Sequence, residues 1–283
     1  YFSGITQEFP WAVVTSSRGC PYNCYYCNKL TFGRKIRYRS PENFMQEIDF
    51  LVEKYKVKEI DIADDCFNFD IERAKKIFDL LALRPYKIHL RFSNGIRADK
   101  IDEEFLKKAK KAGCNYMAIG VESGSQEILN KIPKGETLAD IRKAAMMIKK
   151  AGIPVTGFFM IGLIGDTKET MQQTIDFAKE LDLDIAQFNI AIPNPGTRMW
   201  DMIKANGGEI FIKDWGDFHH VDRCFYSLPG MANPATVEMM YKKAYRDYYF
   251  RFSYILKHAL KYLSPQKIKI IFKGLGVILR RSN

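Results

Sequence analysis

The sequence predicts an α/β fold in which strands and helices alternate along the chain. Strand-like apolar runs recur at regular intervals, and helix-like stretches separate them. Several of these runs are apolar throughout, which is typical of buried parallel strands. At 283 residues the chain is long enough for one large domain and an appendage. The strand-like runs are residues 11–16, 57–63, 86–92, 115–121, 153–161 and 184–190, and the helix-like stretches are residues 41–55, 70–82, 102–112, 124–151 and 168–181.

The residues at the helix ends agree with this assignment. Ser40 followed by Pro41 is typical of a helix start, and Gly113 and Gly152 stand just after lysine-rich helix ends. Six strand–helix units suit an open (β/α)6 barrel, in which functional residues gather at the carboxyl ends of the strands.

The last third of the chain differs from the rest in charge. A turn at residues 193–197 would end the barrel, so we expect a barrel domain over residues 1–197 and a mostly helical extension over residues 198–283. Eleven Lys and Arg residues fall within residues 241–283, against Asp247 alone, so most of the net charge of +11 lies in this tail. Helices are expected at residues 237–262 and from Ser264-Pro265 onward.

The basic tail has three interpretations. Its apolar face can lie on an anionic membrane surface, or it can dock on the barrel while the cations face water. Nucleic acid is a weaker third option, because no RNA-binding signature is present. No apolar stretch approaches the ~20 residues of a membrane span, so the expected location is the cytoplasm, or its membrane face if the tail binds lipid.

Three closely spaced cysteines carry the main chemical signal. Cys20, Cys24 and Cys27 form a Cys-x3-Cys-x2-Cys run, among six cysteines in the whole chain. Iron–sulfur cubanes are usually held by four thiolates, so three would leave one iron open to a substrate or cofactor. Zinc is the alternative, but it normally requires a fourth Cys or His at close spacing, and an odd cluster does not fit a disulfide framework. Nearby cations favour the thiolate form; they are Arg18, Lys29, Arg34, Lys35 and Arg37.

This run resembles the signature of radical S-adenosylmethionine enzymes, including the aromatic Tyr26 before the third cysteine. Four further segments are similar to the branch of that family that is often fused to a cobalamin-binding domain. The resemblance implies a partial (β/α)6 barrel, a 4Fe-4S cluster on the three cysteines and bound S-adenosylmethionine. The matching segments are residues 18–27 (RGCPYNCYYC), 33–42 (GRKIRYRSPE), 64–67 (DDCF), 118–125 (AIGVESGS) and 157–166 (GFFMIGLIGD).

The resemblance also implies roles for polar residues at strand ends. Asp64 and Asp65 stand where relatives bind the amino group of the methionine moiety, and we expect both carboxylates to face the barrel mouth; a surface turn is the alternative. Glu122 matches the position that binds the ribose hydroxyls, or else it interacts with a helix start. Lys134 stands where relatives place a basic residue near the carboxylate of S-adenosylmethionine, and a solvated lysine is equally plausible. Asn94, at the end of the third strand, is a weaker candidate.

Two later strands complete the predicted site. The segment with Gly157, Ile161 and Gly162 resembles the adenine-binding strand, where glycines would let a flat ring approach the backbone. On the sixth strand Gln187 and Asn189 should face one side, so both amides can touch cofactor or substrate if that side is the lumen.

The other cysteines and histidines give no second metal site. Cys66, Cys114 and Cys224 are isolated in sequence, and Cys66 is expected to be a small packed residue. The pair His219-His220 is more typical of a solvated turn than of metal ligands.

The function implied by the resemblance is radical chemistry on an unactivated carbon. A ferredoxin or flavodoxin would reduce the cluster, S-adenosylmethionine would be cleaved, and the resulting 5′-deoxyadenosyl radical would remove a hydrogen atom from the substrate. Methyl transfer is the first expected outcome, on a small molecule or lipid as substrate. Cobalamin would be supplied by a segment upstream of Tyr1 or by another chain, or the protein works without it. The alternatives are an RNA-modifying enzyme such as a methylthiotransferase, which would need a second cluster, and a non-catalytic metal scaffold.

Overall fold

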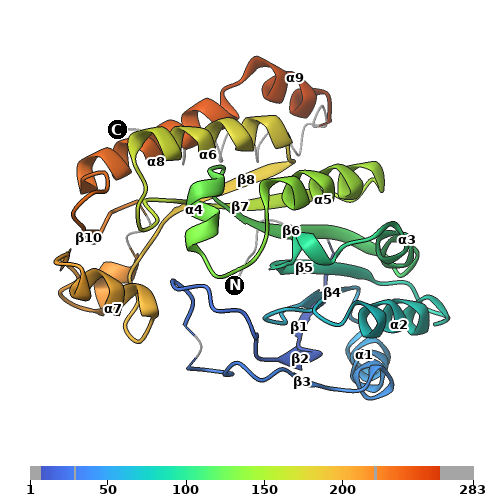
Figure 1. The fold of residues 1–283 in the computed structure, drawn as a ribbon. Coiled ribbons are helices and arrows are strands. Elements are labelled where there is room, and N and C mark those ends of the chain that lie inside the picture. Colours follow the sequence, from blue (N-terminus) through green and yellow to red (C-terminus); the bar gives the residue numbers. More distant parts are fainter. Residues whose placement is uncertain (1–7, 29, 220–221, 262–283) are drawn as a thin grey trace.

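The structure, a computed structural model, describes residues 8–28, 30–219 and 222–261. Its main element is a sheet of six parallel strands whose spatial order follows the chain (Figure 1). Within the described residues its edges, the first and last of these strands, do not pair with each other. The predicted partial (β/α)6 barrel is therefore confirmed as an open sheet. Its strands are β1 (Trp11–Val14), β4 (Glu59–Ile62), β5 (His89–Ile96), β6 (Cys114–Glu122), β7 (Val155–Ile161) and β8 (Ile185–Ile190).

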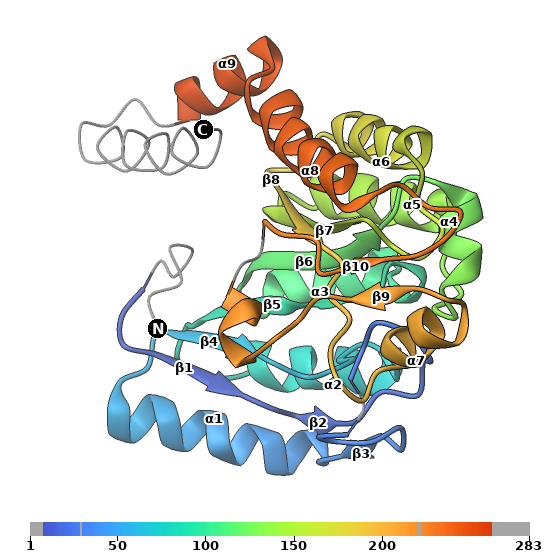
Figure 2. The same cartoon turned by 90° about the vertical axis from the view of Figure 1, so that its left-hand side faces the viewer.

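The connecting helices pack side by side in a row that follows the sheet (Figures 1 and 2). Serine, aspartate or threonine side chains cap most of their amino ends; for example, Ser40 accepts a hydrogen bond from the Asn43 amide at 3.1 Å, and Pro41 occupies the first turn. The helices are α1 (Pro41–Tyr55), α2 (Ile71–Ala82), α3 (Glu103–Lys111), α4 (Gln126–Lys131), α5 (Leu138–Lys150) and α6 (Lys168–Leu181).

Among the differences from the predicted element boundaries, two lie near the predicted site residues. The single helix expected at 124–151 is two helices, α4 and α5, because the segment between them contains Pro133, which cannot donate a backbone hydrogen bond, and Gly135 at a φ of +74°. Strand β5 continues to Ile96, four residues beyond its predicted end at 92, so Asn94 lies inside the strand.

The two faces of the sheet have different chemistry. On β7 and β8, Phe159 and Phe188 point to the helix side, are fully buried and stack with ring centroids 5.1 Å apart. The alternate residues of β8 are less buried: Gln187 is exposed and Asn189 is half-buried. The predicted shared face of these two amides is thus confirmed by the burial pattern, and it is the face away from the apolar core.

The C-terminal extension begins with small elements and continues as two basic helices. Tyrosine hydroxyls from these helices donate to backbone carbonyls along the edge strand β8; Tyr245 bonds to Phe188 at 3.0 Å and Tyr249 to Ala186 at 2.9 Å. These contacts protect an exposed sheet edge. The helix predicted from Ser264 lies outside the described residues, and the division at 197/198 stays a prediction. The elements are α7 (Arg198–Ala205), β9 (Glu209–Ile210), a 3-10 helix (Trp215–His219), β10 (Tyr226–Ser227), α8 (Pro234–Tyr249) and α9 (Phe252–Lys261).

Candidate active site

The three cysteines lie on a loop that follows the short hairpin strand β2 (Ser17–Arg18), which pairs with β3 (Arg37–Tyr38). None of the three forms a disulfide, and each has intermediate exposure. Gly19 precedes the first of them at a φ of +93°, and a Cβ there would collide with the carbonyl oxygen of Lys35. The Cys20 amide donates to the Gly33 carbonyl at 3.3 Å. The hairpin therefore fixes the start of the cysteine loop by close backbone contact, which glycine permits.

The two acids at the end of β4 hold this loop. Asp64 is buried, and its carboxylate accepts hydrogen bonds from the Ser16 amide and from the hydroxyls of Ser16 and Ser17, each at 2.6 Å. The Asp65 carboxylate accepts one from the Gly19 amide at 2.8 Å. Both carboxylates bind the chain that leads into the cysteines, because several donors there require an acceptor. The expectation that they face the barrel mouth stays a prediction.

The main chain of Asp64 makes a further contact. Asn94 donates from its side-chain amide to the Asp64 carbonyl oxygen at 2.9 Å. This bond ties the end of β5 to the end of β4. The predicted roles of Asp64, Asp65 and Asn94 in binding the amino group of S-adenosylmethionine stay predictions.

A cation that the sequence analysis missed supports the middle of the cysteine loop. The guanidinium of Arg97 lies 3.5 Å from the centre of the Tyr22 ring, pairs with Asp99 at 2.8 Å and donates to the carbonyl of Lys134 at 2.9 Å. The amide of Asn23 donates to the carbonyl of residue 133 at 3.3 Å. The signal available in the sequence was a charged residue just after a strand end; its stacking partner lies 75 positions away and could not be read from spacing.

Glu122 and Lys134 meet at the end of β6. The Lys134 ammonium lies 3.0 Å from Glu122 and 2.8 Å from Glu136, and donates to the Gly120 carbonyl at 2.6 Å. Its side chain is 11% exposed, so the alternative of a solvated lysine does not hold. Burial alone would lower the pKa of Lys134, but the two carboxylates outweigh it and hold this pKa above its ordinary value.

Local backbone geometry makes room for this ion pair. Glu122 adopts a φ of +63°, uncommon for a residue with a side chain, at a register irregularity of β6. A Cβ on Gly120 would lie 2.5 Å from the Glu122 carboxylate and 2.7 Å from the Lys134 ammonium. Glycine at that position therefore allows the pair to form.

Tyr26 connects the cysteine loop to Glu122. The ring is largely enclosed, and its burial raises the pKa of Tyr26 well above the usual value, with Glu122 and Cys24 adding to the effect. The structure thus brings together four predicted positions: Cys24, Tyr26, Glu122 and Lys134.

Cys66 is buried, as expected for a small packed residue, and it also contacts the cysteine loop. It is 3% exposed, and a hydrogen bond to Cys20 together with burial raises the pKa of the Cys66 thiol. A fourth thiol therefore lies beside the first of the three predicted ligands. Cys114 and Cys224 are buried elsewhere, each against a backbone carbonyl two residues further along its own strand or loop.

Gly157 of β7 and Gly162, which follows it, lie close to neighbouring side chains. A Cβ on Gly157 would lie 2.5 Å from the Leu183 side chain, and one on Gly162, where φ is +77°, would lie 2.6 Å from Val237 of α8. Both glycines admit protein side chains, and Ile161 between them is fully buried. The adenine-binding role of Gly157, Ile161 and Gly162, and the ligand contact of Asn189, stay predictions.

A row of polar side chains crosses the inner face of four strands. Arg91 pairs with Glu59 at 3.1 Å, and its guanidinium lies 4.6 Å from the centre of the Tyr116 ring. The Tyr116 hydroxyl donates to Thr156 at 2.8 Å. Because Arg91 and Glu59 are both almost completely buried, this pair makes a charged link between β4 and β5 in the interior.

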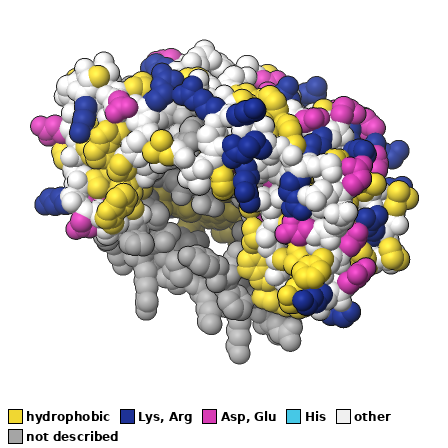
Figure 3. All heavy atoms as spheres, turned by 90° about the horizontal axis from the view of Figure 1, so that it is seen from below, with side chains coloured by type: hydrophobic (Ala, Val, Ile, Leu, Met, Phe, Trp, Pro, Cys, Tyr) yellow, Lys and Arg dark blue, Asp and Glu magenta, His cyan; other side chains and the backbone are white. Residues whose placement is uncertain are grey.

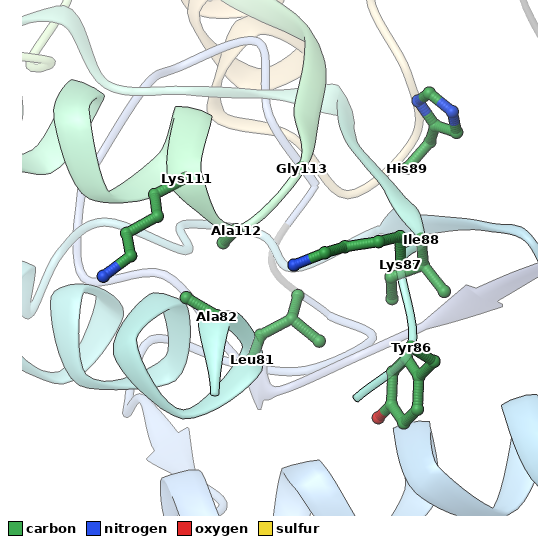
Figure 4. A pocket seen from close by; sticks show the side chains of 9 residues that line it. All are labelled: Leu81, Ala82, Tyr86, Lys87, Ile88, His89, Lys111, Ala112 and Gly113. Carbon is green, nitrogen blue, oxygen red and sulfur yellow. The ribbon is translucent and has the colours of Figure 1, made fainter. Parts of the chain in front are cut away.

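A separate cavity of about 200 Å³ lies at the amino end of the sheet (Figure 4). The ends of α2 and α3 and the start of β5 enclose it, and Lys87 and Lys111 project beside it. The cysteine loop lies at the carboxyl ends of the strands, so this cavity is no part of the candidate active site.

The fold and the loop together define a class of protein. The fold is an open barrel of parallel strands, and three cysteine thiols on a loop at its carboxyl end are the donor set of an iron–sulfur enzyme with one open iron. Among the described residues, no three Cys, His, Asp or Glu side chains converge as the ligands of a single metal ion would. A cubane does not need that convergence, since each thiolate binds its own iron. The residues present therefore fit a cluster.

The chain belongs to the radical SAM superfamily, whose family model matches residues 14–178. Members of this family use a 4Fe-4S cluster and S-adenosylmethionine. The chain is 34% identical over 275 residues to an uncharacterized methyltransferase of Pyrococcus horikoshii, covering 96% of this chain and 56% of that protein.

Two solved structures share the fold. OxsB, a cobalamin-dependent S-adenosylmethionine radical enzyme, superposes with a TM-score of 0.68 at 19% identity, covering 95% of this chain and 45% of OxsB. TsrM of Kitasatospora setae, a radical S-adenosylmethionine methyltransferase with cobalamin and a [4Fe-4S] cluster bound, gives 0.64 at 20% identity, covering 72% of this chain and 42% of TsrM. The chain thus spans about half the length of the relatives it matches. Within the described residues, no helix is both long and apolar enough to cross a membrane.

Proposed function

We propose that this chain is the catalytic barrel of a radical S-adenosylmethionine methyltransferase, working with a cobalamin bound outside these 283 residues. The observation that carries the proposal is the anchored three-cysteine loop beside the Glu122–Lys134 pair. Similarity to the Pyrococcus methyltransferase and to TsrM supports methyl transfer, and similarity to TsrM and OxsB supports a role for cobalamin.

The cluster and S-adenosylmethionine would supply a carbon-centred radical able to take a hydrogen atom from an unactivated carbon. In this proposal Cys20, Cys24 and Cys27 hold the cluster, and the contacts of Asp64 and Asp65 keep their loop in place. Holding a reacting group in a fixed position lowers the entropic part of the barrier.

Glu122 and Lys134 would bind the polar ends of S-adenosylmethionine. Lys134 contacts one oxygen of Glu122, and a carboxylate has further acceptor capacity for a ribose diol. The Lys134 ammonium lies between two carboxylates, so it stays charged. Its three N–H groups already meet Gly120, Glu122 and Glu136, so an added carboxylate would replace one of these partners. Main-chain groups of residues 157–162 would border the adenine, and Asn189 and Gln187 would face the bound molecules from β8.

The substrate is proposed to be a small molecule with a substantial apolar part, such as a lipid. Helix α9 exposes Phe252 by 80% and Ile255 and Leu256 by 49% each, on one face, with Arg251 and Lys257 nearby. Such a face fits the surface of an anionic membrane, where a lipid substrate would be found. A flotation assay on phosphatidylglycerol vesicles tests this: wild type should float, and Phe252→Ser/Ile255→Ser/Leu256→Ser should not, with Met146→Ser on the exposed face of α5 as control.

Anaerobic reconstitution tests the core of the proposal. We expect about four irons per chain and formation of 5′-deoxyadenosine and methionine under a strong reductant. Cys20→Ala, Cys24→Ala and Cys27→Ala should each lose both, whereas Cys224→Ala, buried away from the loop, should retain both. Cys66→Ala should also retain the cluster, because Cys66 is not a ligand in this proposal. A fourth thiolate would occupy the iron that has to stay open for S-adenosylmethionine.

Two outcomes would replace the proposal. About eight irons per chain would favour the second-cluster, RNA-modifying alternative. Intact cluster without cleavage of S-adenosylmethionine would favour the metal scaffold. If cleavage occurs, addition of methylcobalamin and candidate lipids tests methyl transfer directly.

A further inference from the structure

The chain segment that surrounds the cysteines carries positive charge and no negative charge. Between Glu8 and Glu42 the sequence contains six Lys and Arg residues and no Asp or Glu. This segment includes β2, the cysteine loop and β3, which lie together at the bottom of Figure 1. Figure 3 shows the molecule from that side: Lys and Arg side chains gather across the middle of the face, and acidic side chains lie mainly toward its margins.

Several of these cations are not used to stabilise the fold. Arg34, Lys35 and Arg37 are exposed, and no ion pair to any of them is formed within the described residues. Elsewhere cations are commonly paired; Lys75, for example, contacts three carboxylates, and Arg39 of the same segment pairs with Glu47. Free cations on one face repel each other, so their grouping raises the local positive potential.

These cations stand next to the proposed cluster ligands. The backbone of residues 33 and 35 contacts Cys20 and Gly19 directly. Two exposed apolar side chains, Leu30 at 76% and Phe32 at 37%, lie between the last cysteine and the cations. The surface of residues 30–37 therefore combines exposed cations with exposed apolar side chains, a composition that suits a protein interface rather than a plain solvated loop.

An electron that reduces the cluster has to enter near the cysteines, because electron transfer slows steeply with distance. We propose that residues 30–37 form the docking surface for a small, acidic one-electron carrier protein. Its negative face would meet Arg34, Lys35 and Arg37, and its redox group would approach the cysteine loop over Leu30 and Phe32. This inference rests on the proposed function, which supplies the need for a reduced cluster.

The test compares two reductants of opposite charge on the reconstituted full chain. Flavodoxin hydroquinone is an acidic protein, whereas reduced methyl viologen is a small cation. Stopped-flow absorbance at low ionic strength measures the rate at which flavodoxin reduces the cluster. We expect this rate to fall at least about tenfold in Arg34→Glu/Lys35→Glu/Arg37→Glu. Reduction by reduced methyl viologen should not slow. The neutral variant Arg34→Gln/Lys35→Gln/Arg37→Gln should be reduced by flavodoxin at a rate between those of wild type and the charge-reversed variant.

A matched control separates docking from net charge. Lys58, Lys107 and Lys143 are also exposed and lie away from the cysteine loop, in the turn before β4 and on α3 and α5. Lys58→Glu/Lys107→Glu/Lys143→Glu should keep a flavodoxin rate within about twofold of wild type. Added salt should slow wild type more than the Arg34→Glu/Lys35→Glu/Arg37→Glu variant, since screening acts on the attraction that this variant has lost.

Three results would overturn the inference. One is an unchanged flavodoxin rate in the charge-reversed variant; another is an equal slowing with both reductants, which would mean a damaged cluster. The third adds to the first: if the charge-reversed variant keeps its flavodoxin rate and also loses binding to RNA, the surface is assigned to nucleic acid. Failure of the proposed function looks different: wild type itself would show no cluster reduction by either donor, or no cleavage of S-adenosylmethionine once reduced.

Discussion

Replacing Asp64 by alanine should destabilise the protein far more than the same change at Asp65. Asp64 is 1% exposed and accepts three hydrogen bonds of 2.6 Å from Ser16 and Ser17. Hydrogen bonds to a charged group contribute about 1.5–3 kcal/mol each, and repacking recovers part of that. Asp64 is also the charged group that interacts most strongly with the buried Arg73, which donates to the Ser16 carbonyl at 2.8 Å. We expect a loss of about 3–5 kcal/mol, the range for leaving one buried charge without its partner.

The neighbouring acid provides the comparison. Asp65 is exposed and accepts one hydrogen bond, from the Gly19 amide at 2.8 Å, so Asp65→Ala should cost about 1 kcal/mol. Urea unfolding of the apo-protein, followed by far-UV circular dichroism, measures both free energies. Iron content after reconstitution provides a second measurement, and it should fall in Asp64→Ala because the chain entering Cys20 loses its anchor. Equal unfolding free energies for the two variants would refute the argument that Asp64 carries the loop.

Three further predictions concern separate parts of the site. Arg97→Gln removes a positive charge stacked 3.5 Å from the Tyr22 ring, so the midpoint potential of the cluster, measured by redox titration with EPR detection, should become more negative; an unchanged potential would count against this. Gly162→Ala places a Cβ 2.6 Å from Val237 at a φ of +77°, so the free energy of unfolding, measured by thermal unfolding, should fall by about 1–3 kcal/mol. The double variant Gly162→Ala/Val237→Ala should recover part of that loss. Burial raises the pKa of Asp166 to about 6, so the folded state holds its proton longer than the unfolded state. The stabilisation from this group is therefore present below about pH 4 and is lost as the pH rises through about 6. The free energy of unfolding of Asp166→Asn, measured across this pH range, should not show that decrease.

The positions of the strands and helices could be predicted because they depend on local patterns. Apolar runs and capping residues such as Ser40 and Asp70 lie within a few residues of the boundaries that they set. One error has a cause distant in sequence. Strand β1 ends at Val14, before the predicted residue 16, because Ser16 and Ser17 bond to Asp64.

The site was only partly predictable, because its geometry depends on residues distant in sequence. The cysteine spacing identified Cys20, Cys24 and Cys27 directly. By contrast, the contact of Cys66 with Cys20 and the stacking of Arg97 on Tyr22 are made only when strand ends meet at one edge of the sheet. Spacing gives no information on such contacts, and a parallel sheet brings many residues to that edge.

The cysteine loop and the core of the barrel are stabilised by different forces. The loop is held by hydrogen bonds and charges from strand ends, among them those of Asp64, Asp65 and Arg97. The core is apolar and lies on the opposite face of the sheet, where Phe159 and Phe188 pack against the helices. Loss of the three thiols should therefore abolish the cluster while leaving the fold intact, because Cys24 alone among them packs against the core and it is only partly buried. A thermal unfolding transition of the apo Cys20→Ala/Cys24→Ala/Cys27→Ala variant within a few degrees of apo wild type would agree with this separation, whereas a large drop would mean that the loop is part of the folding core.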